Sequence, residues 1–237
     1  MFIKYKRNAF TLAEVLITLG IIGVVAALTI PTLFENYQKK QTVSKLQKAI
    51  SVLNQAYKLS FDDLGEPDSA LDLGAEEYFK TYWAPYIKVS TYCSKAADCG
   101  YKSNNPFISL DNSNMNVGIA DGKNSTRTAF LTPDGFMYIV YTANYPNGSK
   151  DPKPFYRVLV DINGSTPPNR SGNDVFWLVR AEEDGIHPDG YSSSLKSVQQ
   201  YCSYDLSGGS SGNTCGDYIR RSGWKIDSSY PWKPKKK

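Results

Sequence analysis

The hydrophobic and polar positions of the first sixty residues change their spacing once. Residues 10–33 are almost wholly apolar on every side of a helix, and Val15 to Leu33 carries no charge. Beyond residue 34 the apolar positions recur every three or four residues, which is the spacing of one helical stripe. The stripe consists of Val43, Leu46, Ile50, Leu53, Tyr57 and Phe61. We therefore predict one helix from about Phe10 to Phe61, apolar all round in its first half and amphipathic in its second.

The first half of this helix is long enough to span a membrane. The 24 residues from Phe10 to Leu33 form about 36 Å of helix, against a hydrocarbon core of about 30 Å. Pro31 lies inside the helix and lacks an N–H donor, so it should kink or locally open the helix. Basic residues precede the span, which predicts the first nine residues inside and the chain after Leu33 outside.

Turn residues and a second change of spacing divide the rest of the chain. Gly65 and Pro67 end the long helix, and residues 74–89 predict a shorter helix that Pro85 breaks. Alternating apolar and polar positions then predict four strands. Two of these lie in residues 128–143 and join at 133–135, and the others are 154–162 and 174–181. Residues 215–226 predict a short helix and a last strand.

These elements predict an α+β fold. Four successive strands with short connections favour an antiparallel sheet, whose apolar face needs cover. The helical stripe from Val43 to Phe61 is the available cover. The expected domains are a basic segment at 1–9, a half of the helix at 10–33 that lies in a membrane or against copies of itself, an amphipathic half at 34–61, and an extracytoplasmic β-rich domain at 62–237.

The four cysteines indicate an oxidising compartment. Five residues separate Cys93 from Cys99, and twelve separate Cys202 from Cys215. Neither spacing is the Cys-x-x-Cys of zinc or redox sites. Two disulfides are the better interpretation, and three pairings are open in principle. Local pairing closes the shortest loops, and it is the one we predict. The pairs are Cys93–Cys99 and Cys202–Cys215.

Composition allows a real core but gives no charge argument for nucleic acid as a partner. The chain of 237 residues is 41% hydrophobic and has a net charge of +4. Three of its cations lie in the first nine residues, so their removal leaves 4 − 3 = +1. A lysine-rich C-terminus is the local exception, and we expect it to be a solvated terminus. The removed cations are Lys4, Lys6 and Arg7, and the C-terminal lysines are Lys233, Lys235, Lys236 and Lys237.

Catalysis has little support in this sequence. The single histidine, His187, lies in a turn-like segment. Glu182, Glu183 and Asp184 are adjacent acids and fit a solvated turn better than an acid/base pair held apart by a fold. We therefore expect a protein that is not an enzyme.

One loop gathers oxygen ligands. Asp161, Asn163, Asn169 and Asp174 lie in a Gly- and Pro-rich segment between two predicted strands, and such ligands suit calcium. The segment is not an EF-hand, because the twelfth position from Asp161 is Gly172 and not Glu. An Asx-rich turn that fixes a hairpin explains the same residues. We expect no cofactor, with calcium in this loop as the alternative.

Glu14 is the one charge near the start of the apolar run. A carboxylate inside hydrocarbon costs about 2.5–3.5 kcal/mol on insertion scales, so such a charge usually has a partner. Val15 to Leu33 offers none. The partner of Glu14 is therefore expected outside this segment.

Residues 8–31, NAFTLAEVLITLGIIGVVAALTIP, resemble the N-terminal segment of type IV pilins and type II secretion pseudopilins. That family has a short basic leader, a small residue, Phe-Thr-Leu-x-Glu and an apolar run. The resemblance implies cleavage between Ala9 and Phe10 by a membrane prepilin peptidase, which then methylates the amino terminus of Phe10. Ala9 departs from the usual Gly. Glu14 and Pro31 occupy the positions of the family's glutamate and proline.

The resemblance also implies a role. Such proteins are structural subunits of a filament, and Glu14 would pair with the amino terminus of Phe10, on a neighbouring subunit. The implied partners are the peptidase/methyltransferase, other pilin or pseudopilin subunits, and the inner-membrane assembly machinery with its ATPase. The subunit would start in the bacterial inner membrane and end in a periplasmic or extracellular filament. The length of the chain favours a minor subunit.

Two other functions stay open at this point. One is a DNA-uptake pseudopilin, and the other is a membrane-anchored binding domain that does not assemble. Residues 160–178 and 223–232 also resemble the periplasmic domains of some bacterial prepilin-like proteins.

Overall fold

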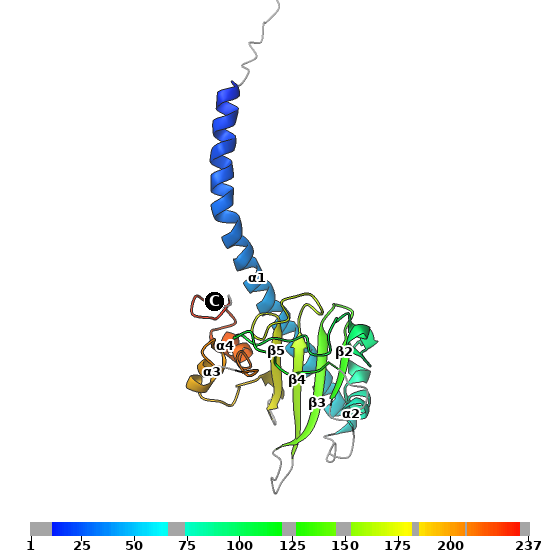
Figure 1. Ribbon diagram of the computed structural model, residues 1–237. Coiled ribbons are helices and arrows are strands. Elements are labelled where there is room, and N and C mark those ends of the chain that lie inside the picture. The colour runs from blue at the N-terminus through cyan, green and yellow to red at the C-terminus, as the bar shows by residue number, and fades with distance from the viewer. Residues whose placement is uncertain are drawn as a thin grey trace, which may run out of the picture. The chain divides into compact units, whose positions relative to one another are not determined.

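The chain folds as two compact units, residues 1–41 and 42–237. The computed structural model describes residues 11–65, 74–119, 127–145, 153–181, 185–206 and 208–232. Figure 1 shows the elements in their order along the chain.

The longest element is α1, a single α-helix from Leu12 to Leu64. It agrees with the predicted helix within three residues at each end. Pro31 lies inside it, and the helix continues through this residue. Only one backbone bond is lost, because the missing N–H of Pro31 would have donated to the carbonyl of Ala27.

The described strands of the second unit form one six-stranded sheet, in the order β1-β2-β3-β4-β5-β6. Figure 1 shows its central strands β2, β3, β4 and β5 side by side. Every neighbouring pair is antiparallel. The four predicted strands are all present, and the two short edge strands β1 and β6 are additional. The strands are β1 Thr91–Tyr92, β2 Arg127–Leu131, β3 Met137–Tyr145, β4 Lys153–Asp161, β5 Val175–Ala181 and β6 Gly185–Pro188. The α+β fold class is confirmed.

The second half of α1 packs on one face of the sheet, as predicted, with half of the predicted stripe buried there. Val43, Leu46 and Leu53 are buried against sheet residues that include Phe130, Val158 and Phe176. Small side chains occupy the remaining buried helix positions, namely Thr42, Ala49, Ala56 and Ser60. The predicted Ile50 and Tyr57 are only half-buried and Phe61 is exposed. The small residues let the helix backbone approach the sheet closely, and Ile50, Tyr57 and Phe61 lie toward the edge of the contact.

One helix side chain also completes the edge of the sheet. Asn54 on α1 donates from Nδ2 to the carbonyl of Ile186 and accepts from the amide of Ile186 at Oδ1, both at 2.8 Å. Ile186 lies on the edge strand β6. The Asn54 amide group thus takes the place of a further strand and satisfies backbone groups that would otherwise lack partners.

The other face of the sheet is covered by the segment between β1 and β2. This segment includes the 3₁₀ helix η2, Ala96–Cys99. Phe107, Met115 and Ile119 from the segment form a second buried cluster with strand residues such as Ile139 and Leu159. The sheet is therefore buried on both faces over its central strands.

Shorter helices complete the second unit. The helix predicted over residues 74–89 is present as α2, Ala75–Tyr82, followed by the 3₁₀ helix η1, Ala84–Tyr86, and the break falls beside Pro85 as expected. Two helices follow the sheet, α3 at Leu195–Tyr201 and α4 at Cys215–Arg221.

The strand predicted after α4 does not form. Gly223 and Trp224 both have left-handed backbone angles, with φ of 71° and 58°, which a strand excludes. The amide of Trp224 instead donates back to the carbonyl of Ile219 at 2.9 Å. The chain then runs without regular structure to Trp232.

Candidate functional site

The carboxylate of Glu14 has a partner within its own chain. Its Oε2 accepts hydrogen bonds from the backbone amide and the hydroxyl of Thr11, both at 2.8 Å. The Thr11 hydroxyl oxygen in turn accepts from the amide of Glu14 at 3.2 Å. This reciprocal pattern is a capping box, which satisfies orphan donors in the first turn of α1. Within its own chain, Glu14 thus has a neutral partner three residues earlier, and the expected pairing with the amino terminus of Phe10 stays a prediction.

The first unit exposes its apolar side chains on all sides. The Leu, Ile and Val residues from Leu12 to Leu33 are each 42–78% exposed. By length and composition, α1 is the one helix in the described part of the chain that qualifies as a membrane span. A side chain of this size gains about 1.5–3 kcal/mol when it is fully buried. Water is therefore a poor surrounding for this segment.

Gly20 and Gly23 lie within the exposed part of α1. A Cβ atom added at either position would meet nothing within 4 Å. The fold of this chain therefore does not itself require glycine at these positions.

Burial of α1 begins at Thr42, nine residues after the end of the predicted span. The Thr42 hydroxyl donates to the carbonyl of Asn173 at 3.3 Å. The side-chain amide of Asn173 donates to the carbonyl of Trp232 at 2.8 Å. Asn173 thus connects Thr42, the first buried residue of α1, with the C-terminal segment, residues 227–232.

The four candidate calcium ligands do come together in the loop between β4 and β5. The amide of Asn163 donates to Asp161 Oδ1 at 3.2 Å, and its side chain donates to Asp174 Oδ2 at 3.3 Å. Asp174 also accepts from the backbone amides of Asn169 and Arg170. These donors hold both carboxylates as an Asx-rich turn does. Among the described residues no three His, Cys, Asp or Glu side chains gather as a metal site.

The two carboxylates of this loop are deeply buried. Asp161 is 0% exposed and Asp174 is 5% exposed. Burial raises the pKa of Asp174 to about 6, and burial together with the charge of Asp174 raises the pKa of Asp161 well above its usual range. The hydroxyl of Tyr101 donates to Asp161 Oδ2 at 2.9 Å, and Lys45 on α1 is the cation that acts on Asp161.

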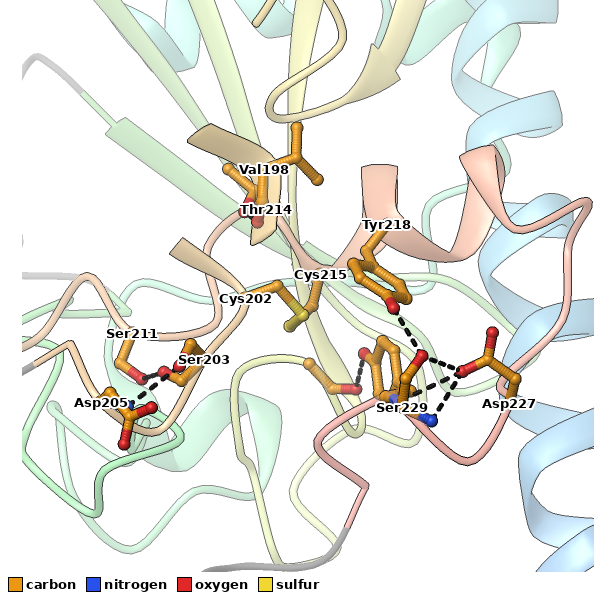
Figure 2. The surroundings of a disulfide bond; sticks show 12 residues. Val198, Cys202, Ser203, Asp205, Ser211, Thr214, Cys215, Tyr218, Asp227 and Ser229 are labelled. Atoms are coloured by element: carbon orange, nitrogen blue, oxygen red, sulfur yellow. Dashed lines mark hydrogen bonds between the residues drawn. A yellow bond between two sulfur atoms is a disulfide. The ribbon is translucent and has the colours of Figure 1, made fainter. Parts of the chain in front are cut away.

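Both predicted disulfides are present. Cys93 pairs with Cys99, and Cys202 pairs with Cys215. Figure 2 shows the second bond, which joins the end of α3 to the start of α4. Gly172 packs against it, since an added Cβ would lie 3.0 Å from the sulfur of Cys215.

The C-terminal segment closes over the same region. The Tyr230 hydroxyl donates to the carbonyl of Gly172. Tyr218 on α4 shares a 2.7 Å hydrogen bond with Ser229, and Ser229 is held by Asp227 (Figure 2). Residues 227–232 are thus fixed to α4 and to the β4–β5 loop.

The other candidate residues either pack within the fold or lie outside the residues that the structure describes. His187 stacks on Tyr191 with ring centroids 3.8 Å apart. Residues 182–184, Ala9, Phe10 and the C-terminal lysines lie outside the described residues. Sequence reasoning missed Thr11, although Thr-x-x-Glu before an apolar run is a recognisable capping signal. It also missed Asn54 and Asn173, whose partners are distant in sequence and gave no local signal.

Comparison with known proteins bears on the N-terminus alone. A family model described as the prokaryotic N-terminal methylation motif matches residues 4–30. No curated protein and no solved structure matches the chain. The matched residues contain Thr11 and Glu14 and most of the exposed apolar part of α1. This motif is the hallmark of type IV pilins and pseudopilins, and the chain carries it at its N-terminus.

Proposed function

We propose that the chain is the precursor of a structural filament subunit of the type IV pilus or type II secretion kind, and that it serves as a minor subunit. A prepilin peptidase cleaves between Ala9 and Phe10 and methylates the amino group of Phe10. The subunit waits in the inner membrane with its β-rich domain outside. Assembly machinery then moves it into a filament.

The exposed first unit carries this proposal. Its twelve Leu, Ile and Val side chains need an apolar surrounding over the whole circumference of the helix. A membrane supplies it before assembly, and the helices of other subunits supply it afterwards. A protein that stays dissolved as a monomer would expose this apolar helix to water, which is unfavourable.

The geometry of Glu14 fits a second role in the assembled state. Thr11 places both of its hydrogen bonds on Oε2, and among the described residues none donates to Oε1, which can therefore receive an amine. We assign this amine to the amino terminus of Phe10 on a neighbouring subunit. In the low dielectric of a helix bundle, either charge alone would be more costly than the pair. The pairing would fix the axial position of one subunit on the next.

Mass spectrometry of the mature N-terminus tests the processing step. The expected product begins at N-methylated Phe10. A product that begins near Leu28 indicates ordinary secretion, and an uncleaved chain indicates a plain membrane anchor. Either result refutes the proposed processing.

Filament formation tests the role of Glu14. Subunits with Glu14→Gln should be cleaved but should be absent from purified filaments. Glu35→Gln is the matched control, because Glu35 lies on the same helix and pairs with Lys39 at 2.9 Å. Normal incorporation of Glu14→Gln subunits would refute the pairing. Salt-dependent binding of DNA to the filaments would instead favour the DNA-uptake alternative.

A further inference from the structure

The uncharged run of α1 matches the thickness of a bilayer and is bounded by polar residues. Val15 to Phe34 carries no charge and comprises 20 residues, which form about 30 Å of helix. The hydrocarbon core of a bilayer is also about 30 Å thick. Glu14 stands directly before the run. A bilayer that surrounds this run would therefore have Glu14 at one boundary of its hydrocarbon and Phe34 at the other.

Three side chains at the second boundary follow a gradient of polarity. Phe34 is wholly apolar, Tyr37 combines a ring with a hydroxyl, and Lys40 carries a charge. Their spacing of three residues places each next to the following one on the helix surface. Because α1 is continuous here, Tyr37 lies about 5 Å and Lys40 about 9 Å beyond Phe34 along the axis. We call these three residues the collar.

The gradient matches the headgroup layer of a bilayer, which is roughly 5–7 Å thick on each side of the hydrocarbon. Phe34 would lie at the inner edge of this layer, Tyr37 within it and Lys40 just beyond it. Aromatic rings are enriched at this depth in membrane proteins. The stem of a lysine can bend back so that its ammonium group reaches the lipid phosphates. Each side chain would thus meet surroundings that suit its chemistry.

The collar is open, and its stretch of helix has a net positive charge. Phe34 and Tyr37 are 60% and 61% exposed, and Lys40 is exposed as well. Glu35 is the one acid between Phe34 and Lys40, and it pairs with Lys39 at 2.9 Å. Lys40 therefore supplies the net charge of this stretch. The complementary surface is apolar on one side and anionic on the other.

We propose that the collar binds the headgroup layer of an anionic phospholipid bilayer on the extracytoplasmic side. The inference rests on the membrane-spanning state of the proposed function. A lysine beside such a surface gives about a fivefold preference for anionic over neutral headgroups. The contact is given up when the subunit leaves the bilayer for the filament.

A photoreactive residue in the collar tests the contact in the full-length protein. Tyr37 is replaced by benzoylphenylalanine, which keeps an aromatic side chain and forms covalent adducts with its neighbours on illumination. The protein is reconstituted at one copy per nanodisc in equal parts of phosphatidylcholine and phosphatidylglycerol, and adducts are identified by mass spectrometry. We expect lipid adducts in which phosphatidylglycerol exceeds phosphatidylcholine by about fivefold. The excess should disappear in 1 M salt, where the Debye length is about 3 Å.

Two controls separate the collar from the rest of the helix. The same photoreactive residue in place of Val25, at the middle of the uncharged run, should give lipid adducts with equal yields of the two lipids, because their acyl chains do not differ. Lys40→Gln should abolish the excess of phosphatidylglycerol at the Tyr37 probe. Lys58→Gln, at an exposed position about 27 Å further along α1, should leave it unchanged.

The outcomes distinguish this inference from the proposed function. A Val25 probe without lipid adducts refutes the membrane span, and with it the proposed function. Lipid adducts at Val25 but none at Tyr37 refute the collar contact alone. An excess of phosphatidylglycerol that is absent, or that Lys40→Gln leaves unchanged, would overturn the assignment to anionic headgroups. In discs with two copies of the chain, protein adducts in place of lipid adducts at Tyr37 would assign the collar to a neighbouring subunit and would also overturn the lipid contact.

Discussion

The buried pair Asp161 and Asp174 predicts that the β-rich domain is more stable in mild acid than at alkaline pH. The charged and titratable groups around the pair are Tyr101 after η2, Lys45 on α1, and the two acids themselves at the ends of β4 and β5. The hydrogen bonds to Asp174 come from neutral amides. Neutralisation by a proton therefore relieves a buried negative charge.

The sign and size follow from the pKa of Asp174. It is about 6 in the folded protein against an ordinary value of 3.8. A folded state with a raised pKa binds more protons than the unfolded state, so its stabilisation is complete below about pH 4 and is lost as the pH rises through about 6. A difference of about two in pKa corresponds to about 3 kcal/mol. Asp161, whose pKa is also raised, extends the loss to higher pH.

Chemical denaturation at several pH values measures this effect on the full-length protein in detergent micelles. We expect the free energy of unfolding to fall by about 2–3 kcal/mol between pH 4 and pH 8. Asp174→Asn should flatten this slope, even though its new amide faces hydrogen-bond donors and lowers stability at every pH. Asp161→Asn is the second variant, in case the first does not fold. Asp62→Asn, at an exposed position of α1, should keep the original slope.

A rise in stability from pH 4 to pH 8 would refute the reasoning. So would a slope that both Asp174→Asn and Asp161→Asn leave unchanged. The first result would mean that Asp161 and Asp174 accept their hydrogen bonds as charged carboxylates at every pH from 4 to 8. The second would place the titrating group elsewhere in the chain.

Three further predictions use the same unfolding measurement. Asn54→Leu should lower the free energy of unfolding by about 2–4 kcal/mol, because it leaves the amide and the carbonyl of Ile186 unpaired; Gln47→Leu, at an exposed position on the same helix, is its control. Loss of the Cys202–Cys215 bond should cost about 3 kcal/mol, against about 2 kcal/mol for the shorter disulfide, since the closed loops differ in length. Calcium or a chelator should leave the melting temperature unchanged, and a calcium-dependent rise would assign an ion to the loop of residues 161–174.

The elements that the sequence predicts well are those whose period is sustained. Fifty residues of helical pattern and four alternating strands define α1 and the centre of the sheet. Their side chains contribute mostly by burial, which is readable from residue type. The α+β fold and its helix-on-sheet packing follow from these elements alone.

The position of the packed face was harder to predict. The hydrophobic stripe correctly includes Leu46 and Leu53, which are buried. It also includes Ile50 and Tyr57, which are only half-buried, and it leaves out the buried Ala49, Ala56 and Ser60. A helix can approach a sheet most closely through small side chains, and these rank low on a scale of hydrophobicity. The error amounts to a rotation of the helix about its axis and leaves the elements unchanged.

The parts that the sequence did not predict depend on partners far along the chain. Strand β6 has four residues, and its outer edge is completed by Asn54, 132 positions earlier. The sequence predicts a strand at the end of residues 215–226, and the chain there and up to Trp232 forms none. It is instead directed by the left-handed turn at Trp224 and by hydrogen bonds to Gly172 and Asn173. No local pattern records such contacts.

The capping box places the carboxylate of Glu14 in a favourable electrostatic environment. The N-terminal end of a helix already carries a partial positive charge of about +0.5, and Thr11 directs the carboxylate to that end. Cleavage before Phe10 would add a full positive charge there, one residue before Thr11. One carboxylate then faces two sources of positive potential, the helix end of its own chain and an amine. Glu14 is therefore tolerable in the precursor without any neighbour, and the filament would gain from a charge that the helix end already holds in place. The capping role and the proposed assembly role of Glu14 would not compete, because they would use different oxygens of the same carboxylate.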